Sequence, residues 1–249
     1  MPGGADFAWL AAIVFASALL YSSGGHAGAS AYLAAMALWS VAPEVMKPTA
    51  LVLNLAVATI GSARFAHARA VPWEVVRPLV FGSMPAAFAG GAIRLSPGVY
   101  LAVLGAALLV AALFLWLRPR AARSRPVPRW PWLVVLGAAL GFLAGLTGIG
   151  GGVFLTPLLI LTGWQEPRRT AGAAAVFILA NSALGLLGHA SSARLVPDAV
   201  VWLVAAAVGG GLVGSWIGAH RLPPLALRRV HSVLLVVSGG KLLLEALRP

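Results

Sequence analysis

The sequence predicts an all-α, polytopic helical membrane protein made of two inverted repeats of five hydrophobic segments, with short helices and Gly-rich turns in each repeat. Three observations indicate this class. Hydrophobic residues make up 60% of the 249 residues, and the mean hydropathy is +0.93. Charged residues make up only 10%, whereas a soluble domain usually carries about 25%. The apolar residues also gather in long runs separated by short polar stretches, which is typical of membrane-spanning helices.

The charges and the composition exclude several classes of function. The chain has six acidic residues, five histidines and a net charge of +12. Its basic residues lie between apolar segments, so we interpret them as setting orientation in the bilayer, not as a nucleic-acid site. The absence of cysteine rules out disulfides and thiolate metal sites. The histidines show no metal-ligand spacing, so we expect no metal and no cofactor. No catalytic set of residues is visible, and we do not expect an enzyme.

Ten apolar segments follow one another along the chain. They cover residues 7–22, 27–42, 49–66, 75–93, 98–117, 131–147, 151–163, 170–188, 197–219 and 226–247. The stretch rich in Arg and Pro between the fifth and sixth segments cannot enter hydrocarbon cheaply. We therefore divide the chain into a first transmembrane repeat (1–117), a cytoplasmic linker (118–130) and a second transmembrane repeat (131–249). No Lys or Arg precedes the first segment, so we expect it to be retained and not cleaved as a signal peptide.

The two halves resemble each other at a constant offset. Asn54 and Asn181 are 127 residues apart, and each is followed by a glycine seven residues later. The same offset relates Arg94-Leu95 to Arg221-Leu222, and the stripe Ser83, Ala87 and Gly91 to the stripe Gly210, Gly214 and Gly218. Several echoes in the same order indicate an internal duplication. We interpret the two stripes of small residues as helix-packing surfaces.

The basic residues predict the orientation of the segments. If the central linker faces the cytoplasm, thirteen Lys and Arg residues lie on the cytoplasmic side and at most five on the outside. This is the bias that membrane proteins show. Both termini then lie outside the cytoplasmic membrane, and an odd number of segments per half makes the halves inverted, a common transporter plan.

A Gly-rich turn interrupts the second half at "GLTGIGGGVFLTP", residues 145–157. The apolar segment after it has about 13 residues, which as helix would span roughly 20 Å of a ~30 Å hydrocarbon core. We therefore predict a hairpin whose turn lies at membrane depth. Non-helical backbone at that depth must be buried in protein or line a wet cavity. Glycine N–H groups, with the start of the next helix and the hydroxyls of Thr147 and Thr156, can bind an anion there. The alternative is close packing of helices through glycine.

The first half has a matching stretch, "SSGGHAGAS" at 22–30, which we expect to approach from the opposite face. His26 within it is the histidine to test as a proton carrier. His67, His189 and His220 lie at segment ends, where we expect water to solvate them.

Polar side chains within apolar segments are the other candidates. Asn54 and Asn181 lie on helical faces with small residues, and Thr170 precedes Asn181 on the same face. Each Asn either lines a pathway or ties two helices together. Lys241 and Glu245 are four residues apart on an apolar helix, which predicts an ion pair near the outer interface. Proton coupling by this pair is the alternative.

The pattern "GxxxGLTGIGGGxxxxPLL", here Gly141 to Leu159, resembles the hallmark of the TauE/SafE sulfite-exporter family. "LNLAVATIG" around Asn54 resembles its counterpart in the first half. The resemblance covers nearly the whole chain, including the basic central loop, although "SSGGHAGAS" departs from the cleaner Gly-rich pattern of the family. It implies a secondary carrier in the cytoplasmic membrane that moves sulfite, organosulfonates or related sulfur-containing anions.

The hypothesis from the sequence is therefore a secondary transporter that works by alternating access, with export as the expected direction. The alternative is a non-transporting membrane subunit that packs with or stabilises a partner protein. The expected partners are a small anion and the lipid bilayer, and no nucleic acid. The sequence does not decide whether the chain forms a homo-oligomer. The predicted substrate-binding residues are Thr147, Gly148, Gly150, Gly151, Gly152, Thr170, Asn181, Asn54, Thr49, Gly25, His26 and Ser30.

Overall fold

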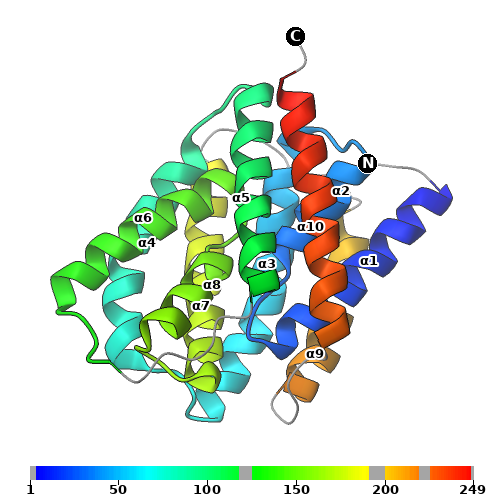
Figure 1. Ribbon diagram of the computed structural model, residues 1–249. Coiled ribbons are helices and arrows are strands. Elements are labelled where there is room, and N and C mark those ends of the chain that lie inside the picture. Colours follow the sequence, from blue (N-terminus) through cyan, green and yellow to red (C-terminus); the bar gives the residue numbers. More distant parts are fainter. Residues whose placement is uncertain (1–3, 118–124, 191–199, 219–224, 248–249) are drawn as a thin grey trace.

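A computed structural model of the chain (Figure 1) describes residues 4–117, 125–190, 200–218 and 225–247. Helices and short connections account for all of these residues, and no strand occurs among them. The helices are α1 (Gly4–Ser23), α2 (Ala29–Leu38), α3 (Pro43–His67), α4 (Trp73–Ala92), α5 (Pro97–Leu117), α6 (Trp130–Thr147), α7 (Gly152–Thr162), α8 (Pro167–Ala190), α9 (Val200–Gly218) and α10 (Leu225–Ala246). The all-α prediction is confirmed, and every predicted segment corresponds to one helix.

The largest boundary differences concern α2 and α3. The predicted segment 27–42 contains a ten-residue helix, because the chain turns before Ala29 and again after Leu38. The segment predicted from residue 49 begins six residues earlier, at Pro43. Proline fits the first helical turn, where its missing N–H has no intrahelical partner to lose. Lys47 is consequently part of a buried helix and not of a loop.

The described helices are apolar enough for a multi-pass membrane protein. Six of them are long and apolar enough to cross a bilayer, whereas α2 and α7 are shorter apolar helices. Seven tryptophans have at least 45% of their surface exposed: Trp9, Trp73, Trp116, Trp130, Trp132, Trp202 and Trp216. Such exposure of large apolar side chains marks an interaction surface in a soluble protein; on membrane helices it faces lipid and the interface.

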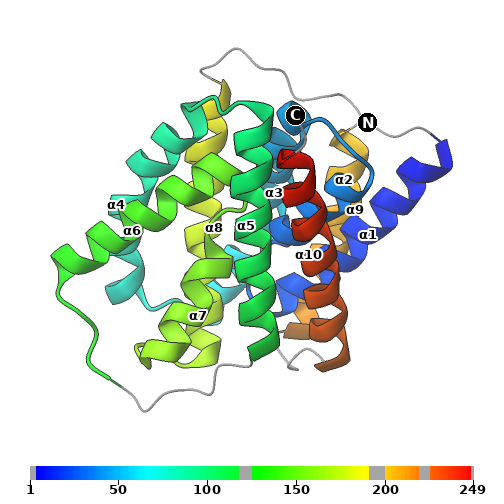
Figure 2. The same ribbon diagram turned by 45° about the horizontal axis from the view of Figure 1, so that its top comes forward.

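The two short helices follow Gly-rich turns; α2 packs on α1, α3 and α10, whereas α7 packs on α8. The chain passes from α1 to α2 and from α6 to α7 through turns rich in glycine (Figures 1 and 2). The ten residues of α2 and the eleven of α7 would reach about 15–17 Å, roughly half of a ~30 Å hydrocarbon core.

Glycine allows helices to pack backbone against backbone. A Cβ on Gly145 would lie 2.0 Å from the carbonyl oxygen of Ala87, which joins α6 to α4. A Cβ on Gly214 would lie 1.9 Å from the carbonyl oxygen of Leu19, which joins α9 to α1. Any larger residue would push these helices apart. Residues of both predicted stripes of small residues make such contacts: Ser83 with Gly141, Ala87 with Gly145, Gly91 with Gly185, Gly210 with Phe15 and Gly214 with Leu19.

The helices form pairs across the two halves. α4 packs on α6 at one side of the bundle and α1 packs on α9 at the other, while α5 pairs with α10 and α3 with α8. Figures 1 and 2 show α5 and α10 between the two outer pairs. The first turn of α1 and the last turn of α10 lie at the same end of the bundle, and α6 begins toward the opposite end.

Candidate functional site

The second Gly-rich turn owes its shape to glycines in the left-handed conformation. The φ angles of Gly148, Gly150 and Gly151 are +85°, +81° and +81°. Residues with a Cβ are strained in this region, whereas glycine is not. The N–H of Gly148 donates to the carbonyl of Ala144 at 2.9 Å and closes α6, and the carbonyl of Gly151 accepts the N–H of Leu155 at 3.1 Å and opens α7. The chain therefore reverses direction within four residues.

The first Gly-rich turn uses the same conformation. The φ angles of Gly25 and Gly28 are +79° and +101°. A Cβ on Gly25 would lie 2.3 Å from the carbonyl oxygen of Ala171 on α8. The turn of the first half thus packs directly on a long helix of the second half. In the same way, a Cβ on Gly148 would lie 3.2–3.3 Å from backbone atoms of Lys47 on α3.

His26 connects the two turns. Its Nδ1 lies 3.0 Å from the carbonyl oxygen of Gly24, and its Nε2 lies 3.2 Å from the carbonyl oxygen of Gly152 and 2.9 Å from the hydroxyl of Thr156. In one tautomer Nδ1–H donates to Gly24 and Nε2 accepts from Thr156; in the other, Nε2–H donates to Gly152. The imidazole is bonded across the two halves in either case. The two bends predicted from separate parts of the sequence are therefore neighbours.

Gly150 is the point at which polar side chains of α3 and α8 approach the second turn. A Cβ on Gly150 would lie 2.8 Å from Nδ2 of Asn54 and 3.2 Å from Oγ of Ser182. Nδ2 of Asn54 also donates to the carbonyl of Ile149 at 3.4 Å. Asn54 thus binds the turn itself, whereas the sequence left open whether it would tie two helices or line a pathway.

Several buried polar atoms of α3 and α8 have no hydrogen-bond partner among the described residues. They are Oδ1 of Asn54, both amide atoms of Asn181, Oγ of Ser182 and Oγ1 of Thr49, and all four side chains are fully buried. Burying a polar group without a partner costs about 1–3 kcal/mol by mutational measures. Most buried polar groups in native proteins have partners, so these unpartnered atoms require an explanation. Nδ2 of Asn181 and Oγ of Ser182 are donors of the kind that an anion uses.

Three predicted hydroxyls make local bonds instead. The hydroxyl of Thr147 donates to the carbonyl of Leu143 at 2.7 Å, and that of Ser30 donates to the hydroxyl of Tyr21 at 3.3 Å. The hydroxyl of Thr170 lies 3.5 Å from the carbonyl of Gln165. Thr170 precedes Asn181 by eleven residues of helix, which is about 16 Å along the axis. The structure places Thr170 near the first turn, beside Ala171, and not near Gly150.

The structure adds Ser182 to the candidate site and shows that the hydroxyl of Thr156 contacts the imidazole of His26. Thr156 follows the second turn by one helical turn, so its spacing alone indicated a candidate hydroxyl. Ser182 is adjacent to Asn181, and only its contact with Gly150 distinguishes it from other small residues of α8. No pattern in the sequence marks it.

The structure corrects the expectation that water solvates His189. The sequence places it at a segment end and predicts solvation, but it is 3% exposed. The cause is the neighbouring Gly188, where a Cβ would lie 2.1 Å from the carbonyl oxygen of Phe88. This contact brings the end of α8 against α4, where His189 is buried. His67 is exposed as predicted, and His220 lies outside the described residues.

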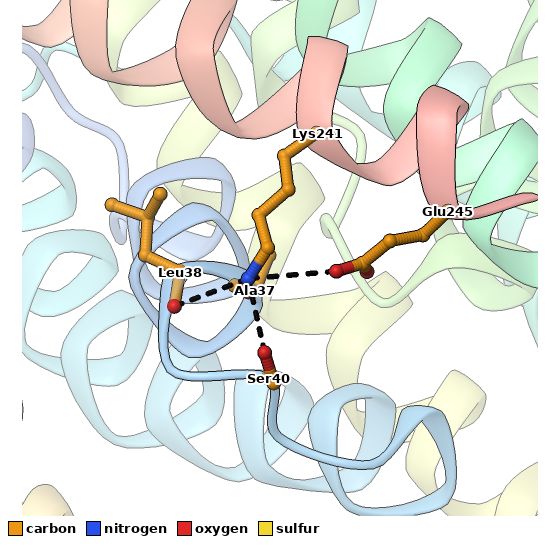
Figure 3. A network of polar contacts seen from close by, with 5 residues as sticks. All are labelled: Ala37, Leu38, Ser40, Lys241 and Glu245. Carbon is orange, nitrogen blue, oxygen red and sulfur yellow. Dashed lines mark hydrogen bonds and ion pairs between the residues drawn. The ribbon is translucent and has the colours of Figure 1, made fainter.

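The predicted pair of Lys241 and Glu245 forms, and the lysine also closes α2. Nζ of Lys241 lies 3.6 Å from the Glu245 carboxylate. It donates to the carbonyls of Ala37 and Leu38 at 2.7 and 3.1 Å and to the Ser40 hydroxyl at 3.0 Å (Figure 3). A cation at the C-terminus of a helix is favourable because the last carbonyls carry partial negative charge. α10 thereby holds the short helix that follows the first turn.

Comparisons with known proteins find similar sequences over most of the chain. The profile described as "Sulfite exporter TauE/SafE" matches residues 10–242. The probable membrane transporter protein y4hK of Sinorhizobium fredii is 42% identical over 240 residues, which cover 94% of this chain and 97% of that protein. The probable membrane transporter protein YjnA of Bacillus subtilis is 27% identical, with 88% of this chain and 92% of that protein covered. No solved structure matches the chain.

Proposed function

The chain belongs to the TauE/SafE sulfite exporter family, and we propose that it is a secondary transporter of small sulfur-containing anions such as sulfite or organosulfonates. One observation carries the proposal beyond the family. Two Gly-rich turns from different halves meet at His26, and fully buried polar atoms without hydrogen-bond partners lie on the adjoining parts of α3 and α8. We place the protein in the cytoplasmic membrane with both termini outside and transport directed outward.

The chemistry of this region favours an anion over a cation. The amides of Asn54 and Asn181 and the hydroxyl of Ser182 can donate hydrogen bonds, and the first N–H groups of α7 have no partner within the helix. The described acidic residues lie at helix ends: Asp6, Glu44, Glu74, Glu166 and Glu245. A cation carrier would be expected to hold a carboxylate at depth. The described residues around Gly150 offer amides and hydroxyls instead.

The helix contacts support alternating access between two inverted halves. Shifting each helix number by five exchanges the pair α4–α6 with the pair α9–α1, and leaves α3–α8 and α5–α10 as pairs. Each glycine turn packs on a long helix of the other half, Gly25 on Ala171 and Gly148 on Lys47. Two halves that meet at their turns can rock about that meeting point and expose it to either side. We take residues 1–117 and 131–249 as these halves.

The test is flux of radiolabelled sulfite and methanesulfonate in proteoliposomes, with chloride as a comparison. We expect Asn181→Leu to lower the flux of the carried anion at least tenfold while the melting temperature in detergent stays the same or rises. The rise is expected because an unpartnered buried amide is replaced by an apolar group. Ser62→Ala, at a buried hydroxyl toward the far end of α3, is the matched control and should keep its flux.

Absence of flux for every oxyanion in the wild-type protein would contradict the proposal. Unchanged flux in Asn181→Leu would show that the amide only packs helices. That second result is what a non-transporting subunit that stabilises a partner predicts for its polar residues.

A further inference from the structure

A pocket opens at the end of the bundle where α3 begins and α4 ends. It is open to the outside, and its interior offers about 30 Å³, which is about the volume of one water molecule. Its charged and polar lining comprises Lys47 and Glu44 from α3, Arg94 and Tyr100 from the α4–α5 region, and His189 from α8. Two cations against one carboxylate give the lining a net positive charge. Leu146, two residues before Gly148, forms part of the wall.

Lys47 is the buried charge of this pocket. Its residue is 6% exposed, and Nζ donates to the carbonyls of Gly90 and Gly91 at 3.2 and 2.9 Å. These are among the last carbonyls of α4, which carry partial negative charge. The two carbonyls hold the ammonium group at the pocket wall. The backbone of Lys47 packs on Gly148 of the second turn.

Packing on the turn does not by itself require a lysine. At the other turn, the residue that contacts Gly25 is Ala171, which has no charge. Burying an ammonium group is costly unless it is well bonded. A lysine at one of these two positions and an alanine at the other therefore point to a role for the charge.

The pocket also reaches the second turn through Tyr100. Its hydroxyl donates to the carbonyl of Thr147 at 3.2 Å, and the residue is 5% exposed. One wall of the pocket is thus bonded to the last residue of α6, three residues before Gly150, which approaches Asn54. The pocket lining and the buried cluster therefore contact the same turn, the lining at Thr147 and Gly148 and the cluster at Ile149 and Gly150.

We propose that the open mouth of this pocket is the docking site at which a small oxyanion, such as a sulfonate, enters or leaves the path at this end of the bundle. Lys47 and Arg94 attract the anion, and Tyr100 and Leu146 separate it from the Gly148 turn until that turn moves. The inference rests on the proposed function for its place in a transport path. The anion preference of the pocket stands on its lining alone.

The absence of cysteine allows a direct test by labelling introduced thiols. Ile93→Cys lies in the pocket lining at a residue that is 40% exposed, and Leu247→Cys, at a residue 81% exposed at the same end, is the control position. Each variant is reacted in detergent with an anionic sulfonatoethyl and a cationic trimethylammonioethyl methanethiosulfonate. A cleft lined by one sign of charge raises the local concentration of the opposite sign by about tenfold or more.

We expect the ratio of anionic to cationic labelling rates to be about tenfold higher for Ile93→Cys than for Leu247→Cys. Adding Lys47→Met or Arg94→Gln should lower the ratio for Ile93→Cys several-fold and leave that for Leu247→Cys unchanged. Methanesulfonate or sulfate should slow labelling of Ile93→Cys only. Arg94→Gln keeps the experiment decisive if Lys47→Met fails to fold, because Arg94 is exposed.

Equal ratios at the two positions, or a ratio that neither charge substitution changes in folded protein, would overturn the inference. Labelling needs no transport, so the two proposals fail separately. Anion-selective labelling without flux would support the anion preference of the pocket and refute the transport function. Flux without anion-selective labelling would refute only the proposal that this pocket docks the anion.

Discussion

At the scale of single residues, the glycines of the second turn serve two requirements that can be separated. Gly148, Gly150 and Gly151 need positive φ angles, and Gly150 must also leave room for Asn54 and Ser182. The first requirement concerns the backbone alone and the second concerns what α3 and α8 bring to the turn. A position that both requires a positive φ angle and contacts the polar cluster should be the least tolerant of change.

Gly150→Ala should therefore lower both stability and flux. The new Cβ would adopt a disfavoured conformation and would approach Asn54 to 2.8 Å, at a cost of about 1–3 kcal/mol in unfolding free energy. Thermal unfolding in detergent, followed by light scattering and tryptophan fluorescence, measures it. Gly240→Ala is the control, because no atom lies within 4 Å of its Cβ. It should be neutral or more stable by up to about 1 kcal/mol, and an equal loss in both variants would refute the assignment.

At the scale of elements, contacts between a few side chains and helix ends hold the two short helices. His26 bonds α7 to the first turn, and Lys241 bonds α10 to the end of α2. Helices of ten or eleven residues are marginal on their own, so these contacts and the surrounding packing maintain them. The buried Lys47 of α3 and the partly exposed Lys241 of α10 both donate to C-terminal helix carbonyls, whose partial negative charge favours a cation.

A double-mutant cycle tests the bond between the two turns. His26→Ala and Thr156→Val should each destabilise the protein, and the double variant should lose less than the sum of the two. We expect a coupling energy of about 0.5–1.5 kcal/mol, the usual net value of a hydrogen bond. The cycle His26→Ala with Thr162→Val is the control, since Thr162 bonds only within α7 in the described contacts. Additive effects in the first cycle would mean that the turns do not interact.

Lys241→Met should destabilise the protein more than Glu245→Gln does. The first change removes the donors to Ala37, Leu38 and Ser40, whereas the second removes a partner at 3.6 Å from a partly exposed pair. We expect about 1–2 kcal/mol for Lys241→Met and less than about 1 kcal/mol for Glu245→Gln. Melting temperatures of the two variants in the same detergent compare them. The reverse order would show that the ion pair, not the closure of α2, is what stabilises this corner.

At the scale of the whole molecule, the bundle is held by close contacts between glycine and backbone across the two halves. α4 with α6 and α1 with α9 approach until a single Cβ would collide with a carbonyl oxygen. An apolar helix surface packs about as favourably on lipid as on another helix. Close backbone contacts and interhelical hydrogen bonds must therefore supply the preference for helix–helix packing. The start of α1 and the end of α10 lie at one end of the bundle and the start of α6 toward the other.

This arrangement makes a prediction about orientation in the cell. A membrane-impermeant maleimide should label Leu247→Cys in intact cells and should label Arg129→Cys only after the membrane is opened. The excess of basic residues around the central linker gives the direction. The opposite labelling pattern would show that the protein has the inverted orientation in the membrane. Labelling of both positions in intact cells would contradict their placement at opposite ends, and labelling after permeabilisation is the control for reactivity.

The sequence by itself determined the features that depend on neighbouring residues. Hydropathy and length specified ten helical segments, the two short ones included. The glycine clusters predicted both turns, and the four-residue spacing of Lys241 and Glu245 predicted their pair. These properties follow from the local energetics of burying a helix in hydrocarbon and of reversing a backbone, for which each segment suffices.

Only the tertiary structure decided which of these features meet. The contact of His26 with Gly152 joins residues 126 apart, and nothing local marks Ser182 as a neighbour of Gly150 or Lys47 as part of a pocket. The separation of Thr170 from Gly150 and the burial of His189 have the same origin. In an apolar helix the faces toward lipid and toward protein have nearly the same composition. The partner of each face is therefore set by where glycine permits two backbones to touch, and that depends on both helices at once.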